Sequence, residues 1–206
     1  MTLTPGPDWQ NELWVSPYSL RFELSDGECV GRYVTQFITS FERARALARL
    51  ALPGEQVVGI IAGFSEPGLV AGAEWHEWTT GTAFDHLAVL GVPSDACLAS
   101  WASYWWHCDV DDPEMEPWQQ RAILLTWDQA DILLWNQVGQ DLGIAPRAPV
   151  QAKLVDLERG ICVDAYDDRG MDITALEKAP LEALYAERND WLLDYDRARM
   201  AAVFEA

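Results

Sequence analysis

The chain has 206 residues, with 14 basic against 33 acidic side chains and a formal net charge of −19. A chain of this length fits one domain that buries about 70% of its unfolded surface, so it needs no disulfide staple. The negative field disfavours direct binding to nucleic acid or to an anionic membrane and would attract a cationic partner. Acidity that serves solubility alone is the simpler alternative, and it stays open.

The cysteines predict a reduced protein. Cys29, Cys97, Cys108 and Cys162 are scattered and form no C-x-x-C pair. The chain opens with no charged-then-apolar leader, and no apolar run approaches the roughly 18 residues of a membrane span. We therefore expect a cytoplasmic protein.

The first third of the chain predicts a strand, a helix and a second strand. Residues 19–25 alternate between apolar and polar, as a half-buried strand does. From 30 to 52 the apolar residues recur at helical spacing, and Pro53 ends that helix. The apolar, branched run 57–64 favours a strand that is buried on both faces.

The middle of the chain has a weaker pattern and holds most of the tryptophans. Ser94 is a suitable N-cap, and the apolar spacing after it predicts a helix over 94–107. A strand over 120–127 and an amphipathic helix over 130–142 follow.

The region 151–204 predicts a hairpin and a helix that covers it. Alternating apolar residues at 161–165 lead into the polar cluster 167–170, after which the period of two resumes. From 180 to 200 the spacing becomes helical. Together these elements predict one α+β domain over 1–206, with a mainly antiparallel sheet covered by helices.

Three short motifs near the C-terminus carry a family resemblance: Tyr-Asp-Asp-Arg-Gly-Met-Asp at 166–172, Asn-Asp-Trp at 189–191 and Asp-Tyr-Asp-Arg at 194–197. With them, and with the Leu-Arg-Phe-Glu-Leu stretch at 20–24, the chain resembles a bacterial family classed only as a domain of unknown function. The resemblance implies no established activity. It does suggest the setting in which such small acidic bacterial proteins often occur, which is toxin and immunity gene pairs.

The acidic residues around Arg169 allow two interpretations. In the structural one, Asp168 is a turn residue, Gly170 supplies a positive φ, and Arg169 forms a forked pair with a carboxylate of the following helix, where Asp190 and Asp194 share a face. In the other, paired carboxylates divide acid and base roles in an enzyme of unrecognised class. We favour the first, whose residues are Asp168, Arg169, Gly170, Asp190, Trp191 and Asp194.

No other motif predicts catalysis, a cofactor or a metal. The run that begins at Asp109 starts like a calcium loop but continues with Pro113 and has neither the glycine nor the glutamate that such a loop needs. His76 and His86 lie ten apart, without partners at zinc spacing. The sequence also lacks a nucleophile elbow and a glycine-rich phosphate loop.

The remaining candidate is a docking surface. An acidic run without a basic residue lies between tryptophans, and interface hot spots favour tryptophan while acids steer a basic partner. A solvated loop is the plainer explanation. The candidate partner-binding residues are Trp75, Trp78, Asp109, Asp111, Asp112, Glu114, Glu116 and Trp118.

We therefore expect an immunity protein, or antitoxin, that occludes the active site of a cationic bacterial toxin such as a nuclease. The alternatives are the enzyme that uses the carboxylates near Arg169 and a general adaptor for protein interactions.

Overall fold

The computed structural model describes residues 5–6, 12–13, 15–25, 32–63, 81–93, 97–103 and 118–205. Over these residues seven strands form one antiparallel sheet in the order β1-β7-β6-β5-β2-β4-β3. The strands are β1 (Ser19–Glu23), β2 (Gln56–Gly63), β3 (Cys97–Ser103), β4 (Trp118–Thr126), β5 (Val150–Asp156), β6 (Ile161–Ala165) and β7 (Gly170–Ala175). The expected α+β class with a mainly antiparallel sheet is confirmed.

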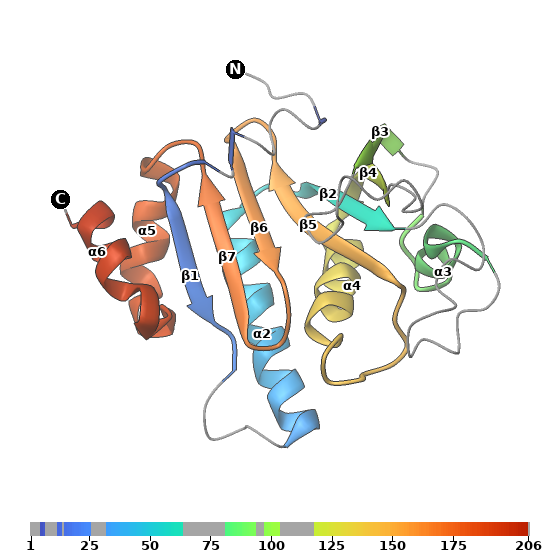
Figure 1. Cartoon of the computed structure of the whole chain (residues 1–206), viewed down its shortest axis with the longest axis horizontal. Helices are drawn as coiled ribbons and strands as arrows, with labels where there is room; N and C mark the ends of the chain where they lie inside the picture. The colour runs from blue at the N-terminus through green and yellow to red at the C-terminus, as the bar shows by residue number, and fades with distance from the viewer. Residues whose placement is uncertain are drawn as a thin grey trace, which may run out of the picture.

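Helices cover one face and one edge of this sheet. They are α2 (Tyr33–Ala51), α3 (Ala83–Val89), α4 (Trp127–Val138), α5 (Ala179–Glu187) and α6 (Arg197–Phe204), with 3-10 turns η1 (Asn189–Trp191) and η2 (Asp194–Asp196). Figure 1 shows α2 and α4 behind the sheet, and α5 and α6 beside β1.

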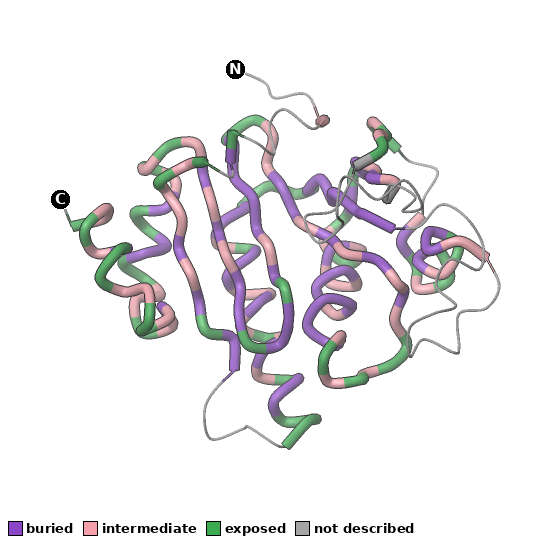
Figure 2. The backbone as a smooth tube through the Cα atoms, in the orientation of Figure 1, coloured by how far each residue is buried: buried purple, intermediate pink, exposed green. Residues whose placement is uncertain are grey.

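The main core lies between the sheet and α2 and α4. Leu20 and Phe22 of β1 point into it from one end of the sheet, and Ile123 of β4 does so from the other. Leu47 of α2 and Leu133 of α4 meet them from the helical side. Figure 2 shows buried residues recurring along the strands of the sheet and along α2 and α4.

A smaller apolar cluster occupies the opposite face of the sheet. Val58 and Ile60 of β2 lie there with Val155 of β5, and Leu13 packs onto them. Strand β2 is therefore buried on both faces, as its sequence predicted.

Helix α4 begins earlier than expected because of its cap. The Thr126 hydroxyl accepts a hydrogen bond from the Gln129 backbone N–H (3.4 Å), and the Gln129 side chain accepts one from Thr126 N–H (3.0 Å). This capping box fixes the first turn at Trp127.

The helix expected over 94–107 is wrong, because residues 97–103 form the edge strand β3, paired with β4. Ala99 and Trp101 alternate onto the smaller apolar cluster, and a bulge lies between Cys97 and Ala99. A strand can also contain apolar residues that are three or four positions apart. Here the residues that pack, Ala99 and Trp101, are two apart, which is the period of a strand.

The single helix expected over 180–200 is also wrong, because the chain forms α5, two 3-10 turns and α6. Leu192 and Leu193 are extended, Leu192 bridges Phe22, and Leu193 N–H donates to the Arg21 carbonyl (2.9 Å). The break lets this segment cover the exposed backbone of edge strand β1, which an uninterrupted helix could not do.

Candidate functional site

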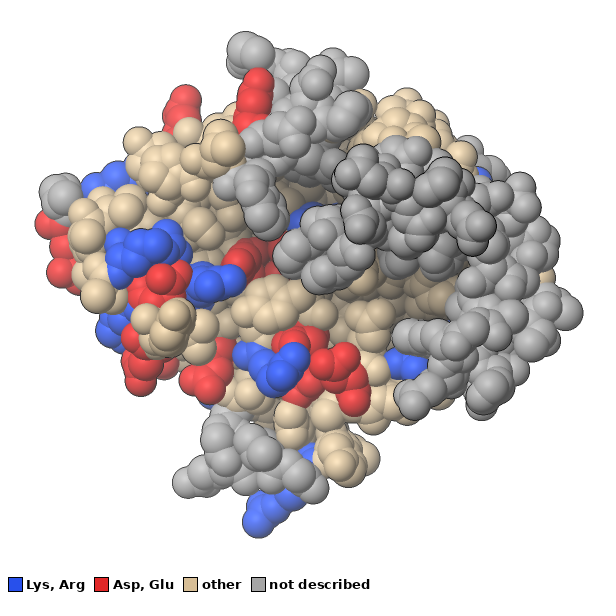
Figure 3. Space-filling view, in the orientation of Figure 1, with Lys and Arg blue, Asp and Glu red and all other residues tan. Residues whose placement is uncertain are grey.

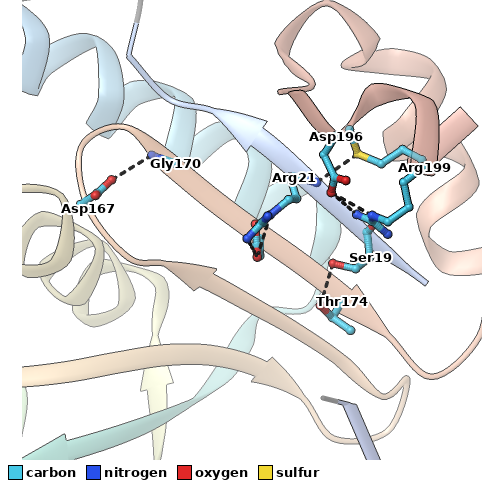
Figure 4. Close-up of polar contacts among 9 residues, drawn as sticks. Ser19, Arg21, Asp167, Gly170, Thr174, Asp196 and Arg199 are labelled. Carbon is cyan, nitrogen blue, oxygen red and sulfur yellow. Dashed lines mark hydrogen bonds and ion pairs between the residues drawn. The ribbon is translucent and has the colours of Figure 1, made fainter. Parts of the chain in front are cut away.

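The β6–β7 turn is built by Asp167. One oxygen of its buried carboxylate accepts hydrogen bonds from the backbone N–H groups of Arg169 (2.7 Å) and Gly170 (3.1 Å). Its second oxygen pairs with the Arg169 guanidinium. One aspartate side chain thus provides the hydrogen-bond acceptor for two backbone N–H groups of the turn, as in Asx turns. Figure 4 shows its bond to Gly170.

Asp168 anchors the same turn to α2. Its side chain is 2% exposed and accepts a hydrogen bond from the Gln36 amide, while its carbonyl accepts one from the Ser40 hydroxyl (2.6 Å). Burial raises the pKa of Asp168, although the bond from Gln36 opposes the shift. Gln36 and Ser40 are themselves buried polar residues one helical turn apart, so sheet and helix are joined by a specific polar contact.

Gly170 is required for space and not for its φ angle. Its φ is not positive, so that expectation is wrong. A Cβ at this position would overlap the hydroxyl and ring of Tyr166, the residue that faces Gly170 across the β6–β7 turn.

The expected bridge from Arg169 to the following helix is also wrong. Arg169 pairs with Asp167 and with Asp141 (3.4 Å), which follows α4. Asp190 and Asp194 lie in separate 3-10 turns, not on one helix face. The arginine closes its own turn, and the bond between sheet and helix is made by Asp168.

The carboxylates of the enzyme alternative are not brought together in one site. Asp168 is buried and accepts a hydrogen bond from Gln36. The Asp194 side chain, in contrast, is 94% exposed and pairs with Arg197 (3.0 Å). Trp191 is half-buried, and the guanidinium groups of Arg43 and Arg188 lie 5.3 and 5.1 Å from its ring centre. Trp191 therefore makes two cation-π contacts, one of them with α2 through Arg43.

A row of charged residues that sequence reasoning missed crosses the sheet face opposite α2. Arg21 of β1 is opposite Asp172 of β7, and Asp172 is opposite Asp164 of β6. The Arg21 Nε lies 3.0 Å from Asp172 Oδ1, and the Lys153 Nζ of β5 lies 2.6 Å from Asp164 Oδ2. Four adjacent strands thus carry charges in the order plus, minus, minus, plus. Figure 4 shows Arg21, at the β1 end of this row.

The protonation of this row limits the chemistry it can do. Burial raises the pKa of Asp172, and Arg21 opposes that shift. Burial lowers the pKa of Lys153, but the charge of Asp164 reverses the balance and the pKa is raised overall. Burial raises the pKa of Cys162 to about 12, so at neutral pH its thiol is protonated. A protonated thiol and a charged lysine are both poor nucleophiles at neutral pH.

The predicted docking residues lie almost wholly outside the described residues. This holds for Trp75, Trp78, Asp109, Asp111, Asp112, Glu114 and Glu116. Trp118 begins β4, where its backbone pairs with that of Ser103. On the face shown in Figure 3, described basic and acidic side chains are intermixed and do not form one acidic patch.

Within the described residues, no three His, Cys, Asp or Glu side chains come together as a metal site. No helix in this described part of the chain has the length and apolar character needed to cross a membrane.

Comparison with known proteins identifies the family. No curated protein and no solved structure matches the chain. A family model described as "Domain of unknown function (DUF3885)" matches residues 10–196, from the segment before β1 to the end of η2. The chain belongs to this family of domains of unknown function, DUF3885.

Proposed function

We propose that this protein binds a cationic protein and neutralises it, as a bacterial immunity protein occludes the active site of a basic toxin such as a nuclease. The observation that carries the proposal is the partition of charge along the chain. The described residues contain all 14 Lys and Arg and 21 of the 33 acids, a net charge of −7. The other 12 acids, a net charge of −12, lie in segments that contain no Lys or Arg.

The described residues, called the framework from here on, compensate most of their own charge. Eight of the fourteen basic residues form ion pairs with described carboxylates, among them Arg21 with Asp172 and Lys153 with Asp164. These eight arginines and lysines are therefore already paired with carboxylates of the framework.

The segments 64–80 and 104–117 carry eight acids between them and contain no Lys or Arg. Like charges close together in the sequence repel each other, and a cationic surface that approaches them lowers this repulsion energy. Such a field accelerates association, while tryptophans within the same segments, including Trp75 and Trp78, would provide the apolar anchors that slow release. We place the protein in the bacterial cytoplasm, where an immunity protein meets its toxin.

Two variants of equal charge test the proposal against a basic toxin encoded beside the gene. The first neutralises the acidic run: Asp109→Asn, Asp111→Asn, Asp112→Asn, Glu114→Gln and Glu116→Gln. The control changes five exposed framework carboxylates, none of which forms an ion pair within the described residues: Glu12, Glu42, Glu55, Glu158 and Glu177, each to Gln.

Both variants remove five negative charges, so general charge effects are equal in the two proteins. We expect the first to slow association about tenfold more than the control and to lose inhibition of the toxin. Equal slowing by both variants would assign the effect to net charge alone and would contradict a localised docking surface.

A further inference from the structure

Strand β3 forms one edge of the sheet, and within the described residues it pairs with β4 alone. From Ala99 to Ser103 this pairing is regular, with Ala99 opposite Ala122 and Ser103 opposite Trp118. In an antiparallel pair every second residue directs its N–H and its C=O away from the partner strand, so an edge strand presents a row of backbone groups to a further strand. Figure 1 shows β3 at the end of the sheet that lies away from β1.

The opposite edge of the sheet is closed by the chain itself. Leu192 bridges Phe22 of β1, and Leu193 N–H donates to the Arg21 carbonyl (2.9 Å). This segment takes up backbone groups of β1 that would otherwise be open to another chain. The described residues place no comparable segment beside β3.

The side chains of β3 leave its edge accessible. The strand reads Cys-Leu-Ala-Ser-Trp-Ala-Ser and contains neither a charged residue nor a proline, which are common means of blocking an edge strand. Ser100 and Ala102 are exposed, and both are too small to shield the backbone beside them. Ala99 and Trp101 pack on the smaller apolar cluster and hold the strand in place. The bulge between Cys97 and Ala99 affects only the start of the strand.

Acidic residues flank this neutral strand on both sides in the sequence. Asp95 lies two residues before it, and the segment 104–117 after it contains five acids and no Lys or Arg. The base that β4 places opposite Ser100 is Arg121, and its guanidinium lies over the Phe84 ring of α3, 3.8 Å from the ring centre. A cationic chain is therefore attracted to the two ends of β3.

Charge also decides between a cationic protein and a second copy of this chain. Two copies related by two-fold symmetry would pair their β3 strands antiparallel, which sets the acid-flanked end of one strand beside the acid-flanked end of the other. Each copy has a net charge of −19, so repulsion opposes this pairing. A partner strand with basic residues next to it meets attraction at the same place.

We propose that the cationic protein partner adds a strand to the sheet at β3, where an extended segment of its chain bonds to the outward backbone groups of residues 99–103. Main-chain hydrogen bonds give such strand addition its affinity. This inference rests on the proposed function, because the partner is the same basic protein. The two contributions differ in kinetics: the flanking acids speed association, and the pairing at β3 slows release.

Amide hydrogen exchange followed by NMR measures this pairing directly, in the free protein and in its complex with the basic toxin encoded beside the gene. In the free protein every second amide of residues 99–103 should exchange fast. In the complex these amides should exchange at least about tenfold more slowly, whereas the amides of β1, whose edge is closed, should not change.

Each other outcome has a distinct meaning. A complex that leaves the β3 amides unprotected overturns this inference and leaves the proposed function standing, whereas the absence of any complex at low ionic strength contradicts both. Protection of all β3 amides in the free protein means that the edge is already closed and also overturns the inference. If that protection disappears on dilution, the occupant is a second copy of this chain.

A proline in the edge separates release from association. Ala99 and Ser100 are neighbours in the strand, so one of them directs its N–H outward, and the exchange rates of the free protein identify which. Ala99→Pro or Ser100→Pro, chosen in this way, removes one outward donor and no bond to β4. We expect dissociation about tenfold faster with an unchanged association rate, whereas the variant with a neutralised acidic run changes the association rate. Unchanged dissociation of a folded proline variant overturns the inference; if the variant unfolds, the exchange measurement decides, since it needs no substitution.

Discussion

Asp168 should stabilise the fold as a hydrogen-bond acceptor and not as a charge. Asp168→Ala removes the acceptor of the buried Gln36 amide, and a buried donor left unpaired is unfavourable by about 1–3 kcal/mol. We therefore expect the alanine variant to lose about 2 kcal/mol of unfolding free energy in urea denaturation. Asp168→Asn keeps an acceptor of the same shape and removes a charge from a buried site, so it should be as stable as wild type or more stable.

The pH dependence of these variants follows from the pKa shift. Because burial raises the pKa of Asp168, the folded protein holds this proton at pH values where the unfolded chain has ionised, starting from an ordinary value of 3.8. The wild type therefore loses stability relative to Asp168→Asn as the pH rises above about 4, and the two should converge below it. Asp190→Ala, at an exposed position, is the control and should change stability by less than about 0.5 kcal/mol. An asparagine variant as unstable as the alanine variant at pH 7 would show that Asp168 stabilises the fold through its charge.

Three further predictions concern the neighbouring residues. Asp194→Asn should change the unfolding free energy by less than about 0.5 kcal/mol, because exposed ion pairs contribute little; thermal melts would contradict this with a loss above 1 kcal/mol. Gly170→Ala should cost about 1–3 kcal/mol, and Tyr166→Ala in the same chain should restore most of it if the clash with that ring is the cause, as measured in a double-mutant cycle. Cys97 is exposed and should react with iodoacetamide at pH 8, whereas Cys162 should stay unlabelled until urea unfolds the protein; mass spectrometry that finds both labelled alike would refute the buried thiol.

Local patterns predicted the elements whose burial or turn geometry is encoded in their own short stretch of sequence. The alternation at 19–25 matches β1, the run at 57–64 matches β2, and the polar cluster at 167–170 matches the β6–β7 turn. In the two strands, burial on one or both faces leaves a direct signature in residue order, and in the turn the polar residues do so.

The parts that were missed depend on contacts between distant residues. Residues 180–200 keep a helical stripe, yet the chain breaks there because Leu193 bonds to the backbone of β1. The charged row on the sheet face needs β1, β7, β6 and β5 in that order, which no local pattern provides. The two buried polar residues of α2, Gln36 and Ser40, were the one available signal that this helix receives a polar anchor.

The acids of segments 64–80 and 104–117 should attract a cationic protein over a long range, and the salt dependence of the association rate measures that attraction. Stopped-flow mixing with the basic toxin encoded beside the gene should give an association rate that falls at least about tenfold between low salt and 0.5 M salt, since screening shortens the reach of the field. A one-to-one complex that forms at a rate independent of salt, or no complex at low ionic strength, would contradict the account.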